Sequence, residues 1–520
     1  MRTLFPTINN LPGMHIDARN LPDHSLIEGD LCIVGTGPAG MSMAMDWNNT
    51  PYKVILLEGG GFEFEPKIQE LYQGTNTGQP YFPLSSAALH YFGGSSNHWG
   101  GFCSPFEELD FEPRPWVPHS GWPFRKADLD PFYKKATHIV DLPESEWDLA
   151  YWQKKDPTLV SLLPDNPVVT DKVWQFSPPT LFGPKYGPAV KESKNIHLYT
   201  YANVVDITAN SNVSNIESMT VKNFAGKEHT VKAKRFVLAC GGIQNPRILL
   251  SCNRQAPKGL GNDRDVVGRY FMEHLEIESA WLHLPKPDPL KLYIKKWAVT
   301  KMRCELGISP AMQEKHSILH GTSCLTPYRE VKGQPPMIKV WNDPDPRKSV
   351  YNANHSHPFM WPHSGFDSRF QLFTRIEQAP NPNSRVTLDT KTDAFGMPLP
   401  ILHWELSAME RRSIRTMHEL IGRQLGAAGA GRVELMSYLE DPDDAKWPDF
   451  TSGGWHHMGT TRMCDDPNFG VVDRNSKVHG IANLFITGSS VYSTAGAPNP
   501  TLTVVAVSLR LSDHLKKLNS

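Results

Sequence analysis

Two histidines and an asparagine near the C-terminus carry the side chains best suited to move a proton. His456 and His457 lie in the run GGWHHMGTTRM, and Asn499 lies in AGAPNPTLT. Histidine has an ordinary pKa of about 6.5, so a neutral imidazole is available as a base at physiological pH. An amide can donate and accept hydrogen bonds without changing its charge. Taken alone, His456 also fits a core histidine, and Asn499 also fits the cap of a helix that starts at Pro500.

A glycine turn near the N-terminus suggests a bound nucleotide. The segment DLCIVGTGPAGMSMAMDW combines an apolar strand, a glycine turn and a helix of small and apolar residues. Gly35 suits the tight turn, Gly37 lets the backbone approach a pyrophosphate, and Gly40 lets helix and strand pack closely. A second strand, YKVILLE, ends at Glu58, near the spacing of about 20 residues at which an acid binds a ribose hydroxyl. This ordered series predicts a dinucleotide site rather than a chance pattern in a βαβ unit.

A glycine-flanked loop, YFGGSSNHWGG at residues 91–101, contains a third candidate group. Its paired glycines bracket a Ser-Ser-Asn-His-Trp core, which indicates a loop whose backbone comes close to another group. His98 lies inside this core. The later run ACGGIQNPRILLSC is a second strand–glycine–helix turn, and it could also contact a dinucleotide.

The remaining elements divide the chain into two parts that would position these residues. Residues 1–29 are predicted to form an extended arm. Residues 276–449 contain β-prone runs split by Pro-rich turns and then one clear helix, SAMERRSIRTMHELIGRQLG. We predict an α/β protein, α+β overall. A Rossmann-like domain (residues 1–275 and 450–520) is interleaved with a substrate domain (276–449) built on a β-sheet backed by helices.

Composition and charge disfavour several classes of function. The 520 residues carry a formal net charge of −1, so there is no basic field to hold nucleic acid or an anionic membrane. The seven cysteines are scattered and form no C-x-x-C pair, so neither a metal site nor a disulfide framework is predicted. No apolar run approaches the ~18 residues of a membrane span, and the N-terminus lacks the apolar core of a signal peptide. We expect a soluble protein, cytoplasmic by default and periplasmic if it is exported bound to a partner.

With these motifs in view, the chain resembles the glucose-methanol-choline (GMC) oxidoreductase family, flavoenzymes that oxidise alcohols. The resemblance covers nearly the whole length. It rests on GTGPAG with Glu58, on GGSSNHW, on ACGGIQNPRILL, on VGRYFMEH, and on HHMGTTRM with AGAPNPTLT. Within the family, the GGSSNHW loop and the C-terminal stretch most resemble those of pyranose oxidases and FAD-dependent sugar or glycoside dehydrogenases.

The resemblance implies FAD as the cofactor and gives these residues roles. His456, three residues before the glycine of Gly-Thr, would be the base, and Asn499 would hold the hydroxyl while flavin N5 accepts the hydride. His457 would be a second substrate contact, the base itself, or a residue behind the base. His98 falls where pyranose oxidases attach FAD covalently, although relatives with a similar loop hold FAD non-covalently. The implied cofactor-binding residues are Gly35, Gly37, Gly40, Glu58, Gly94, Ser95, Asn97, His98, Gly488, Pro500 and Thr501.

The expected reaction is oxidation of a secondary alcohol of a pyranose sugar or glycoside, at C2 or C3, to the keto-sugar. The alternative within the family is a non-sugar alcohol such as choline, a sterol or a simple alcohol. The stretch YNANHSHPFMWPHSGF at residues 351–366 offers the aromatic and polar groups typical of sugar sites, or it is a surface loop.

Three further questions stay open at the level of sequence. The electron acceptor is O₂, a quinone or a cytochrome, and the chain works alone, as a homo-oligomer or with a small partner subunit. A nicotinamide-dependent dehydrogenase would share the N-terminal glycine motif but would not need the C-terminal His…Asn-Pro stretch. A structural flavoprotein subunit would bind FAD without oxidising an alcohol.

Overall fold

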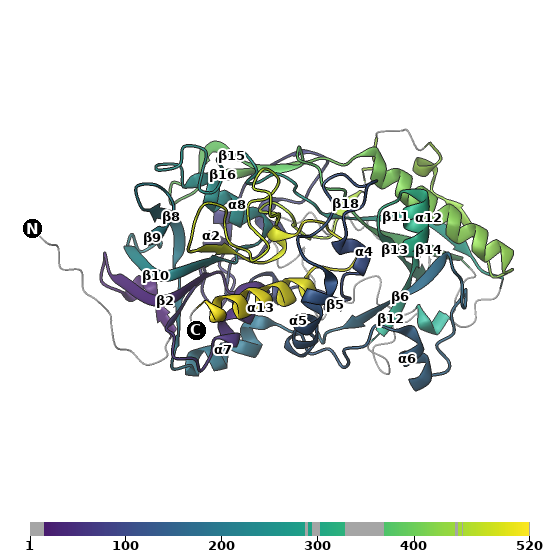
Figure 1. The fold of residues 1–520 in the computed structure, drawn as a ribbon, viewed down its shortest axis with the longest axis horizontal. Helices are drawn as coiled ribbons and strands as arrows, with labels where there is room; N and C mark the ends of the chain where they lie inside the picture. The colour runs from purple at the N-terminus through teal and green to yellow at the C-terminus, as the bar shows by residue number, and fades with distance from the viewer. Residues whose placement is uncertain are drawn as a thin grey trace, which may run out of the picture.

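A computed structural model describes residues 15–285, 290–293, 302–327, 369–441, 446–449 and 451–518. The stretch 351–366 lies outside these described residues, so the predicted sugar-contacting groups there are not placed. The same holds for Trp297 and Trp341, two further aromatic residues of the predicted substrate domain that suit a sugar. Figure 1 shows an elongated molecule whose two large sheets lie towards opposite ends of its long axis.

The first sheet has the parallel core that the N-terminal motif predicts. Strand β3 is buried at all four positions, as expected of a parallel strand covered on both faces. Strands β9 and β8 extend the sheet in antiparallel fashion. The order across the sheet is β1 (His15–Asp17), β7 (Ile196–Thr200), β3 (Val54–Leu57), β2 (Leu26–Val34), β10 (Glu228–Leu238), β9 (Ile216–Lys222) and β8 (Asn203–Ala209), with β19 (Leu484–Ile486) also on β10.

The predicted series of strand, glycine turn, helix and strand is confirmed as β2, α1 (Pro38–Asp46) and β3. Pro38 stands at the first helical position, where its missing N–H costs no hydrogen bond. The predicted arm at residues 1–29 differs from the structure, because β1 pairs with β7 at the sheet edge and β2 already begins at Leu26. The helices that accompany this sheet are α5 (Lys126–Ile139), α7 (Phe182–Glu192), α8 (Gly241–Ser251) and α13 (Thr501–Lys517).

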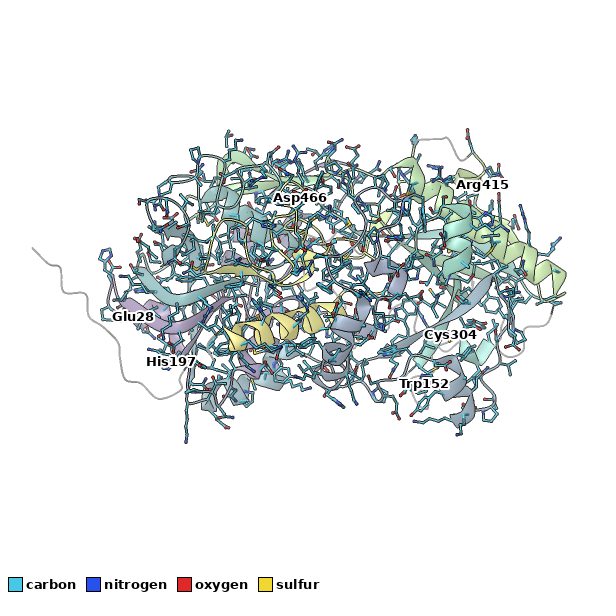
Figure 2. All side chains as sticks on the ribbon, viewed as in Figure 1. Glu28, Trp152, His197, Cys304, Arg415 and Asp466 are labelled. Carbon is cyan, nitrogen blue, oxygen red and sulfur yellow. The ribbon has the colours of Figure 1, made fainter. Side chains whose placement is uncertain are left out.

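The second sheet is antiparallel and lies at the other end of the molecule (Figure 1). Its order is β17 (Arg432–Leu435), β11 (His274–His283), β14 (Arg369–Glu377), β13 (Gly321–Pro327), β12 (Met302–Ile308), β6 (Val169–Phe176) and β5 (Phe102–Cys103), with β18 (Ser452–Gly453) on β11. Helix α12 (Ala408–Ala427) begins at a capping box between Ser407 and Glu410 and buries one face in the core of this sheet. Trp152 and Cys304, labelled in Figure 2, belong to the same core.

A third, three-stranded sheet consists of β4 (Thr75–Gly78), β16 (Pro398–Trp404) and β15 (Arg385–Thr392). The other short elements are α2 (Pro66–Gln69), α3 (Leu84–Ala87), α4 (Glu108–Phe111), α6 (Leu149–Lys155) and α9 (Pro310–His316), and the 3-10 turns Ala18–Asn20, Glu70–Tyr72, Gly94–Asn97, Leu290–Leu292, Ser437–Leu439 and Ser489–Val491. The stretch 62–92 contains three helical turns and a strand.

The second sheet takes strands from both predicted segments. Strands β5 and β6 fall within residues 1–275, yet they pair with each other and, through β12, with the rest of the second sheet. The chain thus passes between the two sheets more often than the two predicted boundaries require. After the second sheet it returns to the first, where α13 packs against α1 and α5. Within the described part of the chain, no helix combines the length and apolarity that a bilayer crossing requires.

Candidate active site

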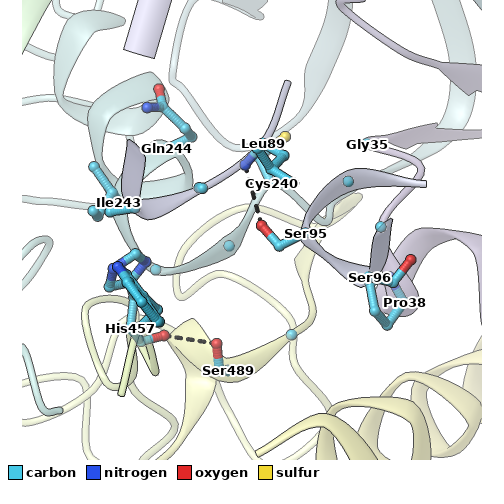
Figure 3. Close-up of a pocket in the computed structure, with 18 of the residues that line it drawn as sticks. Gly35, Pro38, Leu89, Ser95, Ser96, Cys240, Ile243, Gln244, His457 and Ser489 are labelled. Carbon is cyan, nitrogen blue, oxygen red and sulfur yellow. Dashed lines mark hydrogen bonds between the residues drawn. The ribbon is translucent and has the colours of Figure 1, made fainter. Parts of the chain in front are cut away.

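One cavity of about 380 Å³ extends from the first sheet to the second. At one end it is lined by the carboxyl ends of β2 and β3, where parallel α/β sheets bind their ligands. At the other end it is lined by side chains of the second sheet, from β11 to β14. Figure 3 shows its wall between the glycine turn, the start of α8 and the C-terminal segment.

The three glycines of the N-terminal motif have the conformations that their predicted roles require. Gly35 has a φ of +104°, which favours glycine, and a Cβ there would lie 2.7 Å from the Ala239 carbonyl oxygen. A Cβ on Gly37 would meet nothing within 4 Å, because Gly37 borders the cavity. A Cβ on Gly40 would clash with the Gly35 carbonyl oxygen. Gly40 therefore sets the packing of helix and strand, and it does not line the cavity itself.

Glu58 directly follows β3, and its carboxylate lies at the cavity wall, as predicted. The carboxylate accepts hydrogen bonds from the Thr36 hydroxyl at 2.5 Å and from the Gly60 amide at 3.0 Å. Burial raises its pKa, against the effect of these hydrogen bonds. Glu58 is thus a fixed hydrogen-bonding group beside the glycine turn.

The loop at residues 91–101 brings Gly94, Ser95 and His98 to the cavity. His98 Nε2 lies 2.9 Å from the Tyr91 hydroxyl, and burial lowers its pKa to about 4, so the ring is neutral. Asn97, predicted to bind the cofactor, does not line the cavity. Its amide nitrogen instead donates to the Phe92 carbonyl at 2.9 Å and braces the loop.

The C-terminal segment contributes Gly488, Asn499, Pro500 and Thr501 to the same wall. The interpretation of Asn499 as a helix cap is wrong. Helix α13 begins at Thr501, with Pro500 in the cap position, and the Pro500 carbonyl accepts the first helical hydrogen bond. The Asn499 side chain is thereby left for other contacts.

His456 and Asn499 meet at the cavity wall. The Asn499 amide nitrogen lies 3.2 Å from His456 Nε2, and the Asn499 oxygen accepts from Trp174 Nε1 at 3.3 Å. His456 Nδ1 lies 2.9 Å from His274 Nδ1. Burial lowers the pKa of His456 well below its usual value, with further contributions from His274, Arg375 and His457, so the imidazole is neutral. The structure therefore brings the predicted pair together. Two strands of the second sheet support the pair, β6 through Trp174 and β11 through His274.

His457, the neighbour of His456 in the chain, also lines the cavity. Its carbonyl oxygen accepts from the Ser489 hydroxyl at 2.6 Å, and a Cβ on Gly242 would lie only 2.6 Å from the His457 Cβ, so it packs against the start of α8 (Figure 3). Burial lowers its pKa to about 4. Its Nε2 is buried without a hydrogen-bond partner among the described residues. A donor or acceptor in the cavity would satisfy it.

Sequence reasoning missed the residues that hold the pair. Trp174 carries no motif. His274 and Glu273 end the run VGRYFMEH, which was used only for the resemblance. The Glu273 carboxylate accepts the backbone N–H groups of both His274 and His456, at 2.9 Å and 2.7 Å, and contacts the Tyr81 hydroxyl. The signal that the sequence offers is a glutamate directly before a histidine in this run.

Glu273 should make stability depend on pH. Burial raises its pKa to about 8, against its hydrogen bonds. In the unfolded chain the carboxyl ionises near pH 4.5, so the native state loses stability as pH rises from about 4.5 to about 8. Glu273→Gln keeps the acceptor oxygen and removes the titration. Chemical denaturation at pH 5 and pH 8 should show a loss of a few kcal/mol in the unaltered protein that the variant lacks. Equal pH dependence in both proteins would contradict this.

The cavity wall fits a dinucleotide. It combines an open glycine position at the start of α1, a carboxylate at the end of the next strand, and the glycines that begin α8. Helix starts of this kind present backbone N–H groups to a pyrophosphate. Among the described residues, no group of three or more histidine, cysteine or acidic side chains is arranged to hold a metal ion.

Comparisons with known proteins agree with this geometry. Residues 380–508, which include His456 and Asn499, match the family model described as GMC oxidoreductase. Over these residues the chain is similar to this family. GMC oxidoreductases are FAD-dependent enzymes that act on CH–OH groups. The predicted resemblance is confirmed, and so is the α/β fold.

Two curated GMC-type relatives match over most of this chain. A 2-methyl-1,2-propanediol dehydrogenase from Mycolicibacterium austroafricanum is 23% identical and covers 94% of this chain and 95% of its own. A pyranose 2-oxidase from Tricholoma matsutake is 25% identical and covers 82% and 72%. Among solved structures, pyridoxine 4-oxidase from Mesorbium loti has a TM-score of 0.54 at 16% identity, covering 94% of this chain and 99% of its own. The last of these supports the fold alone.

Proposed function

We propose that this protein binds FAD and oxidises a secondary alcohol of a pyranose sugar or glycoside, at C2 or C3, to the ketone. One observation carries the proposal. His456 Nε2 and the Asn499 amide, 3.2 Å apart, line the same cavity as the glycine turn at Gly35 and Gly37. A base and an alcohol-binding amide therefore share one space with a dinucleotide cradle.

The residues that would hold FAD are the cavity-lining members of the predicted set. Gly37 gives the pyrophosphate access to the backbone, and Glu58 would accept from a ribose hydroxyl. When bound, FAD supplies the acceptor for the hydride that leaves the carbinol carbon. The positive end of α13, next to Pro500 and Thr501 at the wall, would stabilise negative charge that develops nearby.

His456 would take the hydroxyl proton on Nε2. Its lowered pKa keeps it unprotonated, so the base is ready without prior loss of a proton. Asn499 would donate to the same hydroxyl oxygen, and Trp174 fixes the orientation of its amide. His457 Nε2, which lacks a partner among the described residues, would contact another substrate hydroxyl.

The substrate end of the cavity supports a polyhydroxylated molecule. It is lined by the aromatic rings of Phe102, Phe373 and Trp455 and by the charged side chains of Glu276 and Arg375. The last two are paired at 2.8 Å, so their charges compensate. Amphipathic rings that stack on a ligand and polar groups that read hydroxyls are typical of sugar sites.

The alternative is a GMC-type enzyme for a non-sugar alcohol, and the similarity to a propanediol dehydrogenase favours it. A substrate panel separates the two. Sugars, glycosides, choline and simple alcohols are offered with O₂ and, separately, with a quinone-like dye, and products are identified by NMR. Flavin bleaching by non-sugar alcohols and by no sugar would overturn the sugar assignment.

The same panel shows whether O₂ or a dehydrogenase-type acceptor, a quinone or a cytochrome, reoxidises the enzyme. Light scattering with and without co-purified protein tests a homo-oligomer against a small partner subunit.

Gly37→Ala should lower the FAD content of the purified protein. Gly37 and Gly426 are matched, because an added Cβ at either meets nothing within 4 Å, but only Gly37 borders the cavity. The new methyl group should therefore matter at Gly37 only when a pyrophosphate lies against it. Absorbance at the flavin band relative to protein should fall in Gly37→Ala and stay unchanged in Gly426→Ala. Full flavin content in Gly37→Ala would show that FAD does not use this turn.

We also propose that His98 attaches FAD covalently. Its ring lines the cavity and is neutral, so a nitrogen lone pair would be available for a bond to the flavin methyl carbon. A C–H bond of that methyl group would break, its proton would be lost, and the two electrons would reduce the flavin, which the enzyme's electron acceptor would then reoxidise. After acid precipitation of the holoenzyme, the yellow colour should remain in the protein pellet. In His98→Ala it should remain in the supernatant. A yellow supernatant from the unaltered protein rules out the bond but leaves the proposed reaction intact.

A further inference from the structure

We propose that His274 is a positioning residue that fixes the tautomer of His456, so that the proton lies on Nδ1 and the lone pair on Nε2 points to the substrate. The inference rests on the proposed function, because it explains why His456 is a base at that atom. It depends on a directed series of hydrogen bonds from the backbone to the cavity.

The series starts at two carbonyl oxygens. His274 Nε2 lies 2.7 Å from the Gly496 oxygen and 3.3 Å from the Ala495 oxygen. Carbonyl oxygens only accept, so His274 Nε2 must carry a proton. His274 is fully buried, and burial lowers its pKa to about 3, so the ring is neutral and has a single N–H. Its Nδ1 is therefore an acceptor.

The acceptor on His274 determines the state of His456. The two Nδ1 atoms are 2.9 Å apart, with the rings edge to face. Two lone pairs or two protons at this distance would repel each other. Since His274 Nδ1 accepts, His456 Nδ1 must donate, and the neutral His456 ring then has its lone pair on Nε2.

The contacts of Asn499, at the cavity end of the hydrogen-bond series, independently require the same tautomer of His456. Trp174 Nε1 can only donate, and it contacts the Asn499 oxygen at 3.3 Å. This leaves the Asn499 NH₂ group facing His456 Nε2 at 3.2 Å, where a lone pair is needed to accept. Both ends therefore require the same tautomer. In a substrate complex, the alcohol hydroxyl can donate to this lone pair.

The backbone keeps the two histidines in register. One oxygen of Glu273 accepts the N–H groups of both His274 and His456. Other charged or titratable groups near the pair are Glu276, Arg375, Glu377 and His457. Arg375 favours the neutral state of both rings, because its positive charge opposes protonation.

Two substitutions of His274 with side chains of similar size distinguish its role in positioning the His456 proton from its role in core packing. In His274→Asn, the amide oxygen takes the place of Nδ1, so an acceptor for His456 is kept. In His274→Gln, the amide nitrogen takes the place of Nε2, so the bond to Gly496 is kept but the acceptor is lost. His418→Gln is the control, because His418 is also buried and bonds through Nε2, at 2.6 Å, to Ser279 on the same strand as His274.

The tautomer is measured without any substrate. In holoenzyme labelled with ¹⁵N-histidine, the His456 signals are assigned by their loss in His456→Gln. We expect a protonated Nδ1 and an unprotonated Nε2 in the unaltered protein, in His274→Asn and in His418→Gln, and a mixture of tautomers in His274→Gln. A proton on Nε2 in the unaltered protein, or an unchanged tautomer in His274→Gln, overturns the inference.

The kinetic consequence is measured with the panel compound that reduces the flavin fastest. Anaerobic stopped-flow should show a fall on the order of 10²-fold in the rate of flavin reduction for His274→Gln, with the apparent Kd for the compound unchanged. His274→Asn should restore most of the rate. If no panel compound reduces the flavin, the proposed function fails. If His456→Ala retains the rate, His456 is not the base and the role of His274 fails with it. If His456→Ala loses the rate and His274→Gln does not, only the role of His274 fails.

Discussion

Replacing His456 by alanine should lower the rate of flavin reduction by about 10²–10⁴-fold, the range expected for loss of a general base. FAD should stay bound, because His456 lies beside Asn499 and not at the glycine turn that would hold the cofactor. Anaerobic stopped-flow with the most active panel compound measures the rate, and the flavin absorbance of the purified variant measures binding.

His479→Ala is the control for this experiment. His479 lies in the same C-terminal segment and bonds the Cys464 carbonyl at 2.8 Å, and it does not line the cavity. Its removal should leave the rate unchanged. Near-normal flavin reduction in His456→Ala would show that another group, with His457 the first candidate, takes the proton.

The second large effect concerns stability. Arg114 and Glu377 form a fully buried ion pair with two parallel hydrogen bonds, at 2.5 Å and 2.9 Å, and Glu377 also accepts the His320 amide at 2.8 Å. Arg114→Met leaves an uncompensated buried carboxylate, and Glu377→Gln leaves an uncompensated guanidinium. Each should cost about 3–5 kcal/mol, measured as a fall in the midpoint of chemical denaturation.

A double variant shows whether the pairing itself is responsible. Arg114→Met combined with Glu377→Gln removes both charges, so it should be less destabilising than the sum of the single changes. Arg474→Met removes an exposed ion pair with Asp465 and should have little effect. Additive losses in the double variant would mean that packing, rather than the uncompensated charge, accounts for the cost.

The parts of this protein that sequence predicts well are local in the chain. The turn at Gly35 and the acid at Glu58 follow from a series of neighbouring residues, and both lie where predicted. The cap at Asn499 was wrong by one residue, because helix ends depend on contacts as well as propensity. Here the Asn499 side chain is hydrogen-bonded to Trp174 and His456, so it does not cap the helix.

The parts that sequence misses depend on distant contacts. Trp174 meets Asn499 across 325 residues, and His274 meets His456 across 182. No periodicity or motif reports such a pairing. Asn97 shows a different kind of error. The sequence predicted it to bind the cofactor because it lies in the right loop, but its amide instead donates to the backbone of that same loop.

These same separations bear on how the chain folds. The contacts that complete the pair join β6 and β11 to a segment that is synthesised after both of these strands, so they form only once both sheets and that segment exist. Contacts so far apart in sequence are slow to form. A refolding chain should therefore recover its far-ultraviolet circular dichroism before it recovers turnover. A nascent chain released before residue 456 would have most of the described strands but would lack the proposed base.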